Sequence, residues 1–391
     1  MNNTKRALPI LFAVMFLVMV GFGIIIPVLP FYAEEMGASP AELGLLMAAY
    51  SVMQLLFAPM WGRISDRIGR KPVMIIGITG LAFSFFLMAA ATKLWMLFAA
   101  RILGGFLSSA NMPTVMAYVA DITTEEERGK GMGVIGASVG LGFIFGPAIG
   151  GIFSKTSLSM PFAIAGISSL ITIILVTLVL KESLQKTKKS QEAKDRRSLR
   201  QILGNAISIL YVLQLFVSLS LAGLEATFAY FAAEKAGLGT VELGYIFMIM
   251  GLAGAVVQGG LVGVLTKKLG EGFVIQMGTI VSAIGFWLIL FVDSFLTAAI
   301  FLTIFGIGNG VIRPAVSALL TKTSTAGHGS TTGLLSSFDS FGRIIGPPLG
   351  GWLFSAAIGL PYIFGIVLSV VAFFLFQIYR IQSNKIKQAA T

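Results

Sequence analysis

Long apolar runs separated by short polar segments make up almost the whole chain. Many of these runs reach or exceed about 18 residues, the length that a helix needs to cross the hydrocarbon core of a bilayer. The pattern therefore predicts an all-α integral membrane protein with twelve spans. We place these spans at residues 8–32, 40–61, 73–92, 95–118, 131–153, 160–180, 206–232, 242–265, 272–292, 295–320, 330–356 and 360–380.

One segment inside these apolar runs occurs twice, 200 residues apart. Residues 142–151 read GFIFGPAIGG and residues 342–351 read GRIIGPPLGG, so six of ten positions are identical. Glycine and proline disturb helices, and their repetition at this spacing indicates two related halves rather than chance. A membrane protein built from two similar halves is typical of transporters, in which a solute path opens alternately to either side.

The only long polar stretch lies between the two halves. Residues 181–200 contain eight basic and three acidic side chains, which excludes them from the membrane. We therefore predict an N-terminal six-helix bundle at 1–180, a cytoplasmic basic linker at 181–201 and a C-terminal six-helix bundle at 202–391. The two bundles would be pseudo-symmetric.

Composition agrees with a membrane protein and excludes several kinds of chemistry. Hydrophobic residues make up 56% of the chain and charged residues 12%, and this is too apolar for a soluble protein. Cysteine is absent and a single histidine is present, which leaves no thiolate or histidine cluster for a metal and no catalytic triad. We expect no metal site and no enzymatic activity.

The net charge of +11 follows the membrane topology. With the N-terminus in the cytoplasm, the inner segments hold 22 of the 28 Lys and Arg residues, and the outer loops hold Lys93, Lys155 and Lys235. Basic residues retained on the cytoplasmic side explain this bias without a nucleic-acid partner. Both termini are therefore predicted to be cytoplasmic.

A basic motif lies between the second and third predicted spans. Residues 62–72 read GRISDRIGRKP, where glycines allow a tight turn and an acid can pair with arginine. The motif resembles motif A of the major facilitator superfamily, and the spans and repeat extend this resemblance to the whole chain. By resemblance, Asp66, Arg70 and Asp121 contribute to gating. The motif residues are Gly62, Asp66, Arg67, Gly69, Arg70 and Lys71.

The first copy of the repeat is similar to motif C, the antiporter motif of this superfamily. Its residues here are Gly142, Gly146, Pro147, Gly150 and Gly151. Small residues let another helix approach closely and proline bends the helix. Ordinary tight packing is the alternative explanation. The resemblance implies export by exchange, with the fifth and eleventh spans as pivots.

Glu225 is an acid well inside the seventh predicted span. An ionisable carboxylate at this depth marks a proton or ion pathway. A cationic solute beside it would compete with the proton, and this competition couples export to proton entry. A position in an outer loop is the alternative. The surroundings of Glu225 resemble Gram-positive multidrug and quinolone efflux proteins, and the whole chain resembles the twelve-helix drug:proton antiporters, which also include tetracycline efflux proteins.

Asp339 and Arg101 are further charged residues within predicted spans. Asp339 lies four residues before Arg343, so the two can meet on one helix face. This pair is either structural or part of the proton or substrate site. Arg101 either needs a partner or cavity, or lies near the outer interface and snorkels to water. Its segment resembles motif B, whose arginine is implicated in proton transfer.

Thirty-one Phe and 17 Met provide an adaptable surface for varied flat ligands. Asn309 stands where the resembled efflux proteins have an acid, so a mechanism with two acids would need Asp339 instead. The expected cavity residues are Tyr50, Gln54, Asn111, Phe143, Gln214, Tyr230, Asn309, Arg313, Phe338 and Arg343.

Together these features predict a proton-coupled antiporter of the bacterial plasma membrane. It would export amphipathic, cationic drugs by alternating access, as a monomer in the lipid bilayer, driven by the proton-motive force without a cofactor. The alternative is a narrow-substrate exporter or symporter of a sugar or other metabolite. A membrane enzyme or sensor would need a catalytic constellation or an added soluble domain, and the sequence shows neither.

Overall fold

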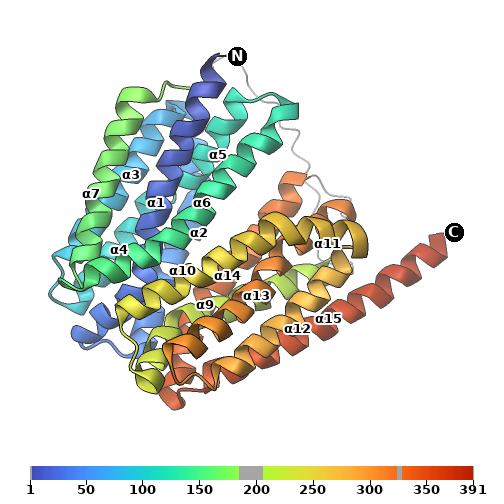
Figure 1. Ribbon diagram of the computed structural model, residues 1–391. Coiled ribbons are helices and arrows are strands. Elements are labelled where there is room, and N and C mark those ends of the chain that lie inside the picture. Colours follow the sequence, from blue (N-terminus) through green and yellow to red (C-terminus); the bar gives the residue numbers. More distant parts are fainter. Residues whose placement is uncertain (1, 185–205, 324–327, 391) are drawn as a thin grey trace. The chain divides into compact units, whose positions relative to one another are not determined.

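The computed structural model of the protein describes residues 2–184, 206–323 and 328–390. Within these ranges the backbone is helical and contains no β-strand (Figure 1). The helices are α1 (Asn2–Glu35), α2 (Pro40–Ile68), α3 (Arg70–Ala89), α4 (Leu94–Ser108), α5 (Asn111–Ile122), α6 (Glu125–Ser154), α7 (Met160–Val179), α9 (Ser208–Ala236), α10 (Thr240–Val256), the π-helix η1 (Val257–Leu261), α11 (Val262–Leu269), α12 (Glu271–Ile289), α13 (Phe295–Thr323), α14 (His328–Ala356) and α15 (Leu360–Ala390).

Most of the predicted spans are found as long apolar helices. In the described residues, ten helical stretches are long and apolar enough to cross a bilayer. One of them, Thr240–Leu269, combines α10, η1 and α11. The predicted span 330–356 is a continuous helix, α14, but it is not among the ten. Its serines, glycines and two charged residues lower its hydropathy.

The predicted span 95–118 is interrupted, which corrects the sequence-based expectation of one helix. A turn at Ser109 and Ala110 separates α4 from α5. Ser109 Oγ bonds back to the carbonyl of Phe106 at 2.7 Å. Pro113, four residues after Ser109, has no N–H to continue the helix ladder, and its ring would clash with the carbonyl there. The two shorter helices together cover the predicted span.

The predicted loop 62–72 is also shorter than expected. Helix α2 continues to Ile68 and α3 begins at Arg70, so Gly69 alone separates them. Gly69 has φ of 114°, a conformation that side chains with a Cβ rarely adopt. Gly270 occupies the equivalent place between α11 and α12, with φ of 85°. The two halves therefore share this turn, although only the first carries the full motif.

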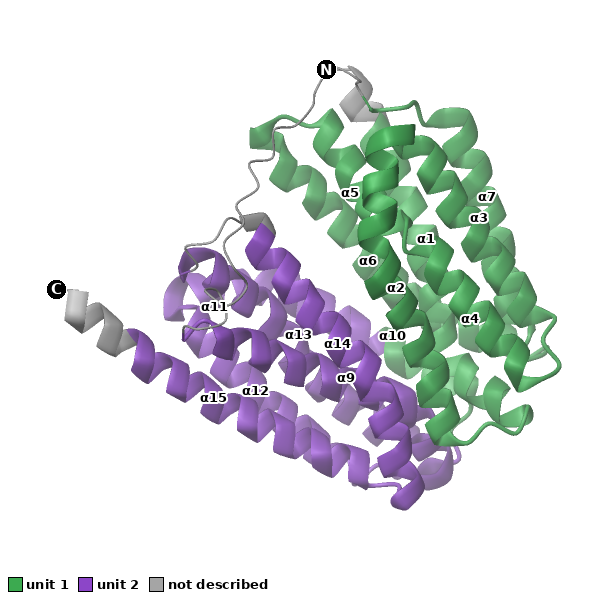
Figure 2. Cartoon of the chain, turned by 180° about the vertical axis from the view of Figure 1, so that it is seen from behind, with its two compact units in different colours: residues 1–190, 238–248 green, residues 191–237, 249–391 purple. Residues whose placement is uncertain are grey.

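The chain divides into two compact units, which Figure 2 colours separately. Unit 1 comprises Met1–Ser190 and Leu238–Met248, and unit 2 comprises Gln191–Gly237 and Ile249–Thr391. The start of α10 therefore groups with unit 1. The predicted basic linker lies mostly outside the described residues, so the division into 1–180, 181–201 and 202–391 stays a prediction.

The repeated glycine–proline segment plays the same packing role in both units. In unit 1, α6 packs against α1, and a Cβ added to Gly146 would lie 2.7 Å from the Cα of Gly23. In unit 2, α14 packs against α9, and a Cβ added to Gly346 would lie 2.5 Å from the carbonyl oxygen of Leu219. Such distances leave no room for a side chain. Each glycine thus lets two helix backbones meet.

Candidate functional site

Unit 2 contains two acid–arginine pairs that join its helices. Glu225 lies on α9, and its Oε2 is 3.8 Å from Nη1 of Arg343 on α14. The Glu225 side chain is 17% exposed and the Arg343 side chain 43% exposed. Glu225 is 11 residues from the end of α9, about 16 Å along the axis. The carboxylate is therefore well inside the helix, and this agrees with the predicted intramembrane position.

Asp339 forms the second pair with a denser set of hydrogen bonds. Its Oδ2 is 3.1 Å from Nη2 of Arg313 on α13. Its Oδ1 accepts a hydrogen bond from Nε2 of Gln214 at 2.9 Å and another from the hydroxyl of Ser218, both on α9. Asp339 is 8% exposed. A carboxylate held by three donors on two neighbouring helices also links α9, α13 and α14 together.

The predicted ion pair between Asp339 and Arg343 does not form. Both residues lie on α14 four positions apart, but each pairs with a residue of another helix, Asp339 with Arg313 and Arg343 with Glu225. Spacing along one helix permits contact but does not exclude a partner from a neighbouring helix. Packing of α9 and α13 beside α14 supplies those partners.

The four charged groups form a balanced set. With both carboxylates ionised, two negative and two positive side chains sum to zero. A proton on either carboxylate leaves its arginine without an ionised partner and raises the charge of the set to +1, and a cation beside the ionised set raises the charge by the same amount. A proton and a cation would therefore compete for the same carboxylates.

The other predicted residues of unit 2 have different surroundings. The ring of Phe338 stacks on Tyr211 with 5.6 Å between centroids, and Tyr230 lies 6.0 Å from Phe354. Asn309 is 7% exposed and donates to the carbonyl of Val217 at 3.4 Å. It lines a small hydroxyl-rich pocket of about 10 Å³. Asn309 is therefore a packed interior residue of unit 2.

Unit 1 brings together three of the residues predicted from its spans. The guanidinium carbon of Arg101 on α4 lies 4.6 Å from the centroid of the Tyr50 ring on α2. The Tyr50 hydroxyl shares a hydrogen bond with Ser108 and accepts one from Nε2 of Gln54 at 3.1 Å. Arg101 is 6% exposed. It is therefore buried in the bundle and does not reach an exposed surface of unit 1.

Asn111 and Phe143, the remaining predictions in unit 1, do not join this group. The Asn111 amide packs against Gly77, where an added Cβ would lie 2.3 Å from Oδ1. Neither amide atom has a hydrogen-bond partner among the residues that the structure describes. Phe143 is 37% exposed on α6. Asn111 thus fills a contact between helices.

The motif A residues form an ionic cluster at one end of unit 1. Arg70 bridges two acids, with Nη1 at 2.5 Å from Oδ1 of Asp66 and Nε at 3.1 Å from Oδ2 of Asp121. Arg70 Nη1 also donates to Ser65 Oγ at 2.7 Å. Arg70 is 7% exposed. Asp66, Arg70 and Asp121 therefore lie in one contact cluster, while the gating role predicted for them stays a prediction.

The other motif residues contribute less to this cluster. Lys71 Nζ donates to the carbonyl of Thr177 near the end of α7 at 2.7 Å. Arg67 is exposed. An added Cβ at Gly62 would meet only an ordinary contact with Pro113 at 3.9 Å. The motif thus acts mainly through Gly69, Arg70 and their partners.

Glu182 belongs to the same cluster, although the sequence analysis did not select it. Its carboxylate accepts hydrogen bonds from the backbone N–H groups of Arg70 at 2.9 Å and Lys71 at 3.0 Å, the first residues of α3. It also accepts from the backbone of Ser183 and Leu184. A carboxylate is favourable at a helix N-terminus. The signal in the sequence was an acid right after a span, in a segment dominated by basic residues.

The hydrogen bonds of Glu182 have a consequence for its titration. Desolvation by neighbouring atoms acts to raise the pKa of the Glu182 carboxyl. The four backbone N–H donors favour the ionised form more strongly, and they hold the pKa below its usual value. At pH values above its pKa in the unfolded chain, such a carboxyl group stabilises the folded protein. This contribution disappears as the pH falls through the pKa that the group has in the folded protein.

Replacing Glu182 by Gln is expected to lower the stability of the protein by about 1 kcal/mol at neutral pH, because the amide nitrogen cannot accept a hydrogen bond from α3. The difference in melting temperature between wild type and variant should stay constant from neutral pH to about pH 5. It should shrink below about pH 4, the range where carboxylates ordinarily titrate. Glu34→Gln, which neutralises an exposed acid, is the control. An E182Q difference that grows as the pH falls would contradict the capping role.

Gly142, Gly146 and Gly150 of motif C lie on the side of α6 that packs against α1, and Gly151 faces the start of α10. All five motif residues, from Gly142 to Gly151, are buried. Gly142 contacts Met19 and Gly150 contacts Ile24, so the glycines follow α1 over several turns. The prediction of close helix packing is confirmed, and the role of α6 as a pivot stays a prediction.

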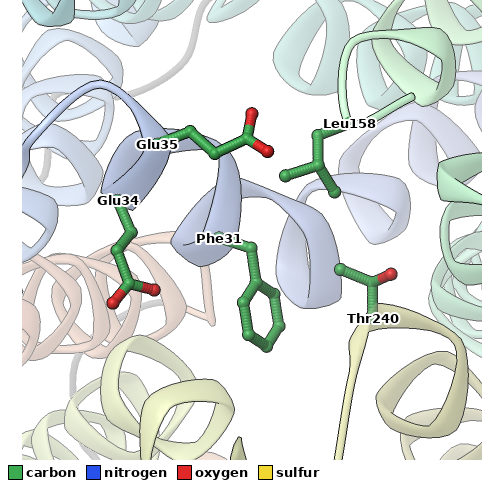
Figure 3. A pocket seen from close by; sticks show the side chains of 5 residues that line it. All are labelled: Phe31, Glu34, Glu35, Leu158 and Thr240. Carbon is green, nitrogen blue, oxygen red and sulfur yellow. The ribbon is translucent and has the colours of Figure 1, made fainter.

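A pocket of unit 1 lies away from these residues. It has a volume of about 470 Å³ at the end of α1, and Figure 3 shows the side chains around it. It is lined by Phe31, Glu34, Glu35, Leu158 and Thr240. None of the predicted site residues lines it, so its volume says nothing about the charged groups above.

Comparison with known proteins agrees with the repeat and the motifs. A family model described as Major Facilitator Superfamily matches residues 11–278 and 259–390. Multidrug resistance protein 2 of Bacillus subtilis is 33% identical, and the match covers 98% of this chain and 97% of that protein. Quinolone resistance protein NorA of Staphylococcus aureus is 27% identical, covering 97% and 98%. The fold is similar to that of a bacterial homologue of the human lysosomal transporter Spinster, with a TM-score of 0.83 at 15% identity and 98% coverage of both chains.

Proposed function

The chain belongs to the major facilitator superfamily of membrane transporters, and we propose that it is a proton-coupled antiporter that exports amphipathic, cationic drugs. The names of its relatives, a multidrug resistance protein and a quinolone resistance protein, support drugs as the substrate class. The acid–arginine pairs of unit 2 support coupling to protons. The energy source would be the proton-motive force of the bacterial plasma membrane, without a cofactor, and both termini would be cytoplasmic.

The pair of Glu225 and Arg343 is the observation that carries the proton coupling. It is the looser pair, at 3.8 Å, and Glu225 has no other ion-pair partner among the described residues. A cation entering from the cytoplasm competes for the ionised carboxylate with Arg343 and with the proton. On the outer side, the higher proton concentration of an energised cell favours the protonated carboxyl and releases the cation.

Asp339 has a supporting part in this proposal. Its carboxylate has three donors, and these hold it more firmly than Glu225 is held. We assign proton exchange to Glu225, and to Asp339 the task of placing Arg313 and α13 relative to α9. Arg343 then balances Glu225 whenever no substrate is bound.

Motif C supports export over import. Its glycines hold α1 and α6 in close contact, and by resemblance this motif occurs in exchangers. In an exchanger, the empty carrier returns only with a proton bound, so substrate and proton move in opposite directions. Alternating access would then convert inward proton flow into outward drug flow.

The function is tested by accumulation of a cationic dye, ethidium, and of a quinolone in bacteria with and without the protein. We expect lower accumulation of both compounds in cells that make the protein. The difference should be larger at external pH 6 than at pH 8, because the inward proton gradient is steeper. A difference that is lost when a protonophore is added supports coupling. Equal accumulation at both pH values in the two strains would reject the proposal in favour of a narrow-substrate transporter.

A further inference from the structure

Among the described residues, Arg101 of unit 1 is a buried cation without a carboxylate partner. It is the eighth residue of α4, about 10 Å from the start of the helix by its rise. The residue is 6% exposed, and its Nε is enclosed without a hydrogen bond. Across the described ranges, the Tyr50 ring is the group that faces the guanidinium.

The acidic residues of unit 1 lie too far along their helices to serve as a counter-ion. They all stand at helix ends or just beyond them, and none of those that the structure describes forms an ion pair with Arg101. These residues are Glu34, Glu35, Glu42, Asp66, Asp121, Glu125, Glu126, Glu127, Glu182 and Glu242. In unit 2, by contrast, both intrahelical acids pair with arginine.

This arrangement is costly unless something else binds there. Burying an unpaired charge costs more free energy than a cation–π contact returns. Leucine or methionine at position 101 would pack without that cost. The Tyr50 ring is in turn held by Ser108 and Gln54 through its hydroxyl. The chain therefore keeps the guanidinium both unpaired and oriented.

We propose that Arg101, set against the Tyr50 ring, is an anion subsite that binds the carboxylate of zwitterionic substrates. A planar guanidinium offers two parallel N–H donors, which match the two oxygens of a carboxylate. The Tyr50 ring lies against the guanidinium and fixes the plane of these donors. This inference rests on the proposed function and deepens it: beside purely cationic drugs, the protein takes amphiphiles that carry a carboxylate as well as a cation.

Binding of ciprofloxacin and of its methyl ester to the purified protein in lipid nanodiscs tests the subsite. Both compounds keep the cationic piperazine, and only the acid has a carboxylate. Their intrinsic fluorescence gives Kd by anisotropy. Arg101→Gln should weaken binding of the acid about ten-fold or more, the effect of losing a charged hydrogen bond. Binding of the ester should change less than about two-fold.

Two further variants keep the result interpretable. Arg101→Lys retains the charge but lacks the two parallel N–H donors. Compared with Arg101→Gln, it should restore part of the preference for the acid. Tyr50→Phe retains the ring and should leave the ratio of the two Kd values close to that of wild type. A variant that loses structure weakens both ligands together, so the ratio separates folding from recognition.

The outcomes also separate this inference from the proposed function. If wild type binds and exports the ester but R101Q changes both ligands equally, Arg101 is structural and the subsite is rejected. If wild type neither binds nor exports the ester, the export of cationic amphiphiles itself fails. A loss confined to the acid in R101Q, partly restored in R101K, supports the subsite.

Discussion

Replacing Glu225 by Gln is expected to abolish proton-driven export while leaving the protein folded. The amide keeps the size of the side chain beside Arg343 on α14, but it cannot bind or release a proton. In proteoliposomes with an imposed pH gradient, ethidium transport by the variant should fall to the level of empty liposomes.

This prediction has a control on the same helix. Glu234 lies exposed near the end of α9, and Glu234→Gln removes the same charge without touching the acid–arginine pairs. Its transport should match that of wild type. Asp339→Asn provides the second comparison, and we expect it to lower the melting temperature, since it weakens the contacts of Arg313, Gln214 and Ser218. Undiminished proton-driven export by E225Q would remove Glu225 from the mechanism.

The second large effect is expected at the contact between α1 and α6. Replacing Gly146 by Ala would place a Cβ 2.7 Å from backbone atoms of Gly23 and Val20. Because backbone cannot move aside as a side chain can, the two helices must separate. Overpacking of this kind costs about 1–3 kcal/mol. We expect a lower melting temperature and a smaller yield of monodisperse protein in detergent.

Gly140 supplies the matched control for that substitution. It lies on the same helix, and an added Cβ there meets nothing within 4 Å. Alanine favours the helical backbone over glycine by about 1 kcal/mol. Gly140→Ala should therefore be neutral or stabilising, opposite in sign to Gly146→Ala. A G146A variant as stable as G140A would show that α1 and α6 are not held together by this glycine.

Much of the fold could be predicted from the sequence because membrane helices carry a strong and simple signal. Ten apolar helical stretches of the structure coincide with predicted spans. The other two predicted spans, 95–118 and 330–356, are not among these stretches, and the reasons are local. Ser109 and Pro113 interrupt the span 95–118, and the polar residues of α14 dilute its hydropathy. Local interruptions depend on single residues, which a hydropathy average does not resolve.

The candidate site was predicted residue by residue, but its pairing was not. The sequence identified Glu225, Asp339, Arg313 and Arg343 as charged residues within spans. It suggested a pair along one helix, between Asp339 and Arg343, whereas the structure pairs residues of different helices. Distance along a helix is known from spacing, but distance between helices depends on how they pack. Glu182 was missed for the same reason, because its partners lie 112 and 111 positions away.

By itself, the sequence determined the number and length of the apolar segments, the internal repeat, the positive-inside bias and the family motifs. Each of these depends on residues close together in the chain or on a fixed period. Only the tertiary structure decided which charges neutralise one another, that Glu182 caps α3, and that Arg101 faces an aromatic ring instead of an acid. Those contacts join residues far apart in the chain. Their energies depend on burial and on distances between helices, and both exist only once the helices have packed.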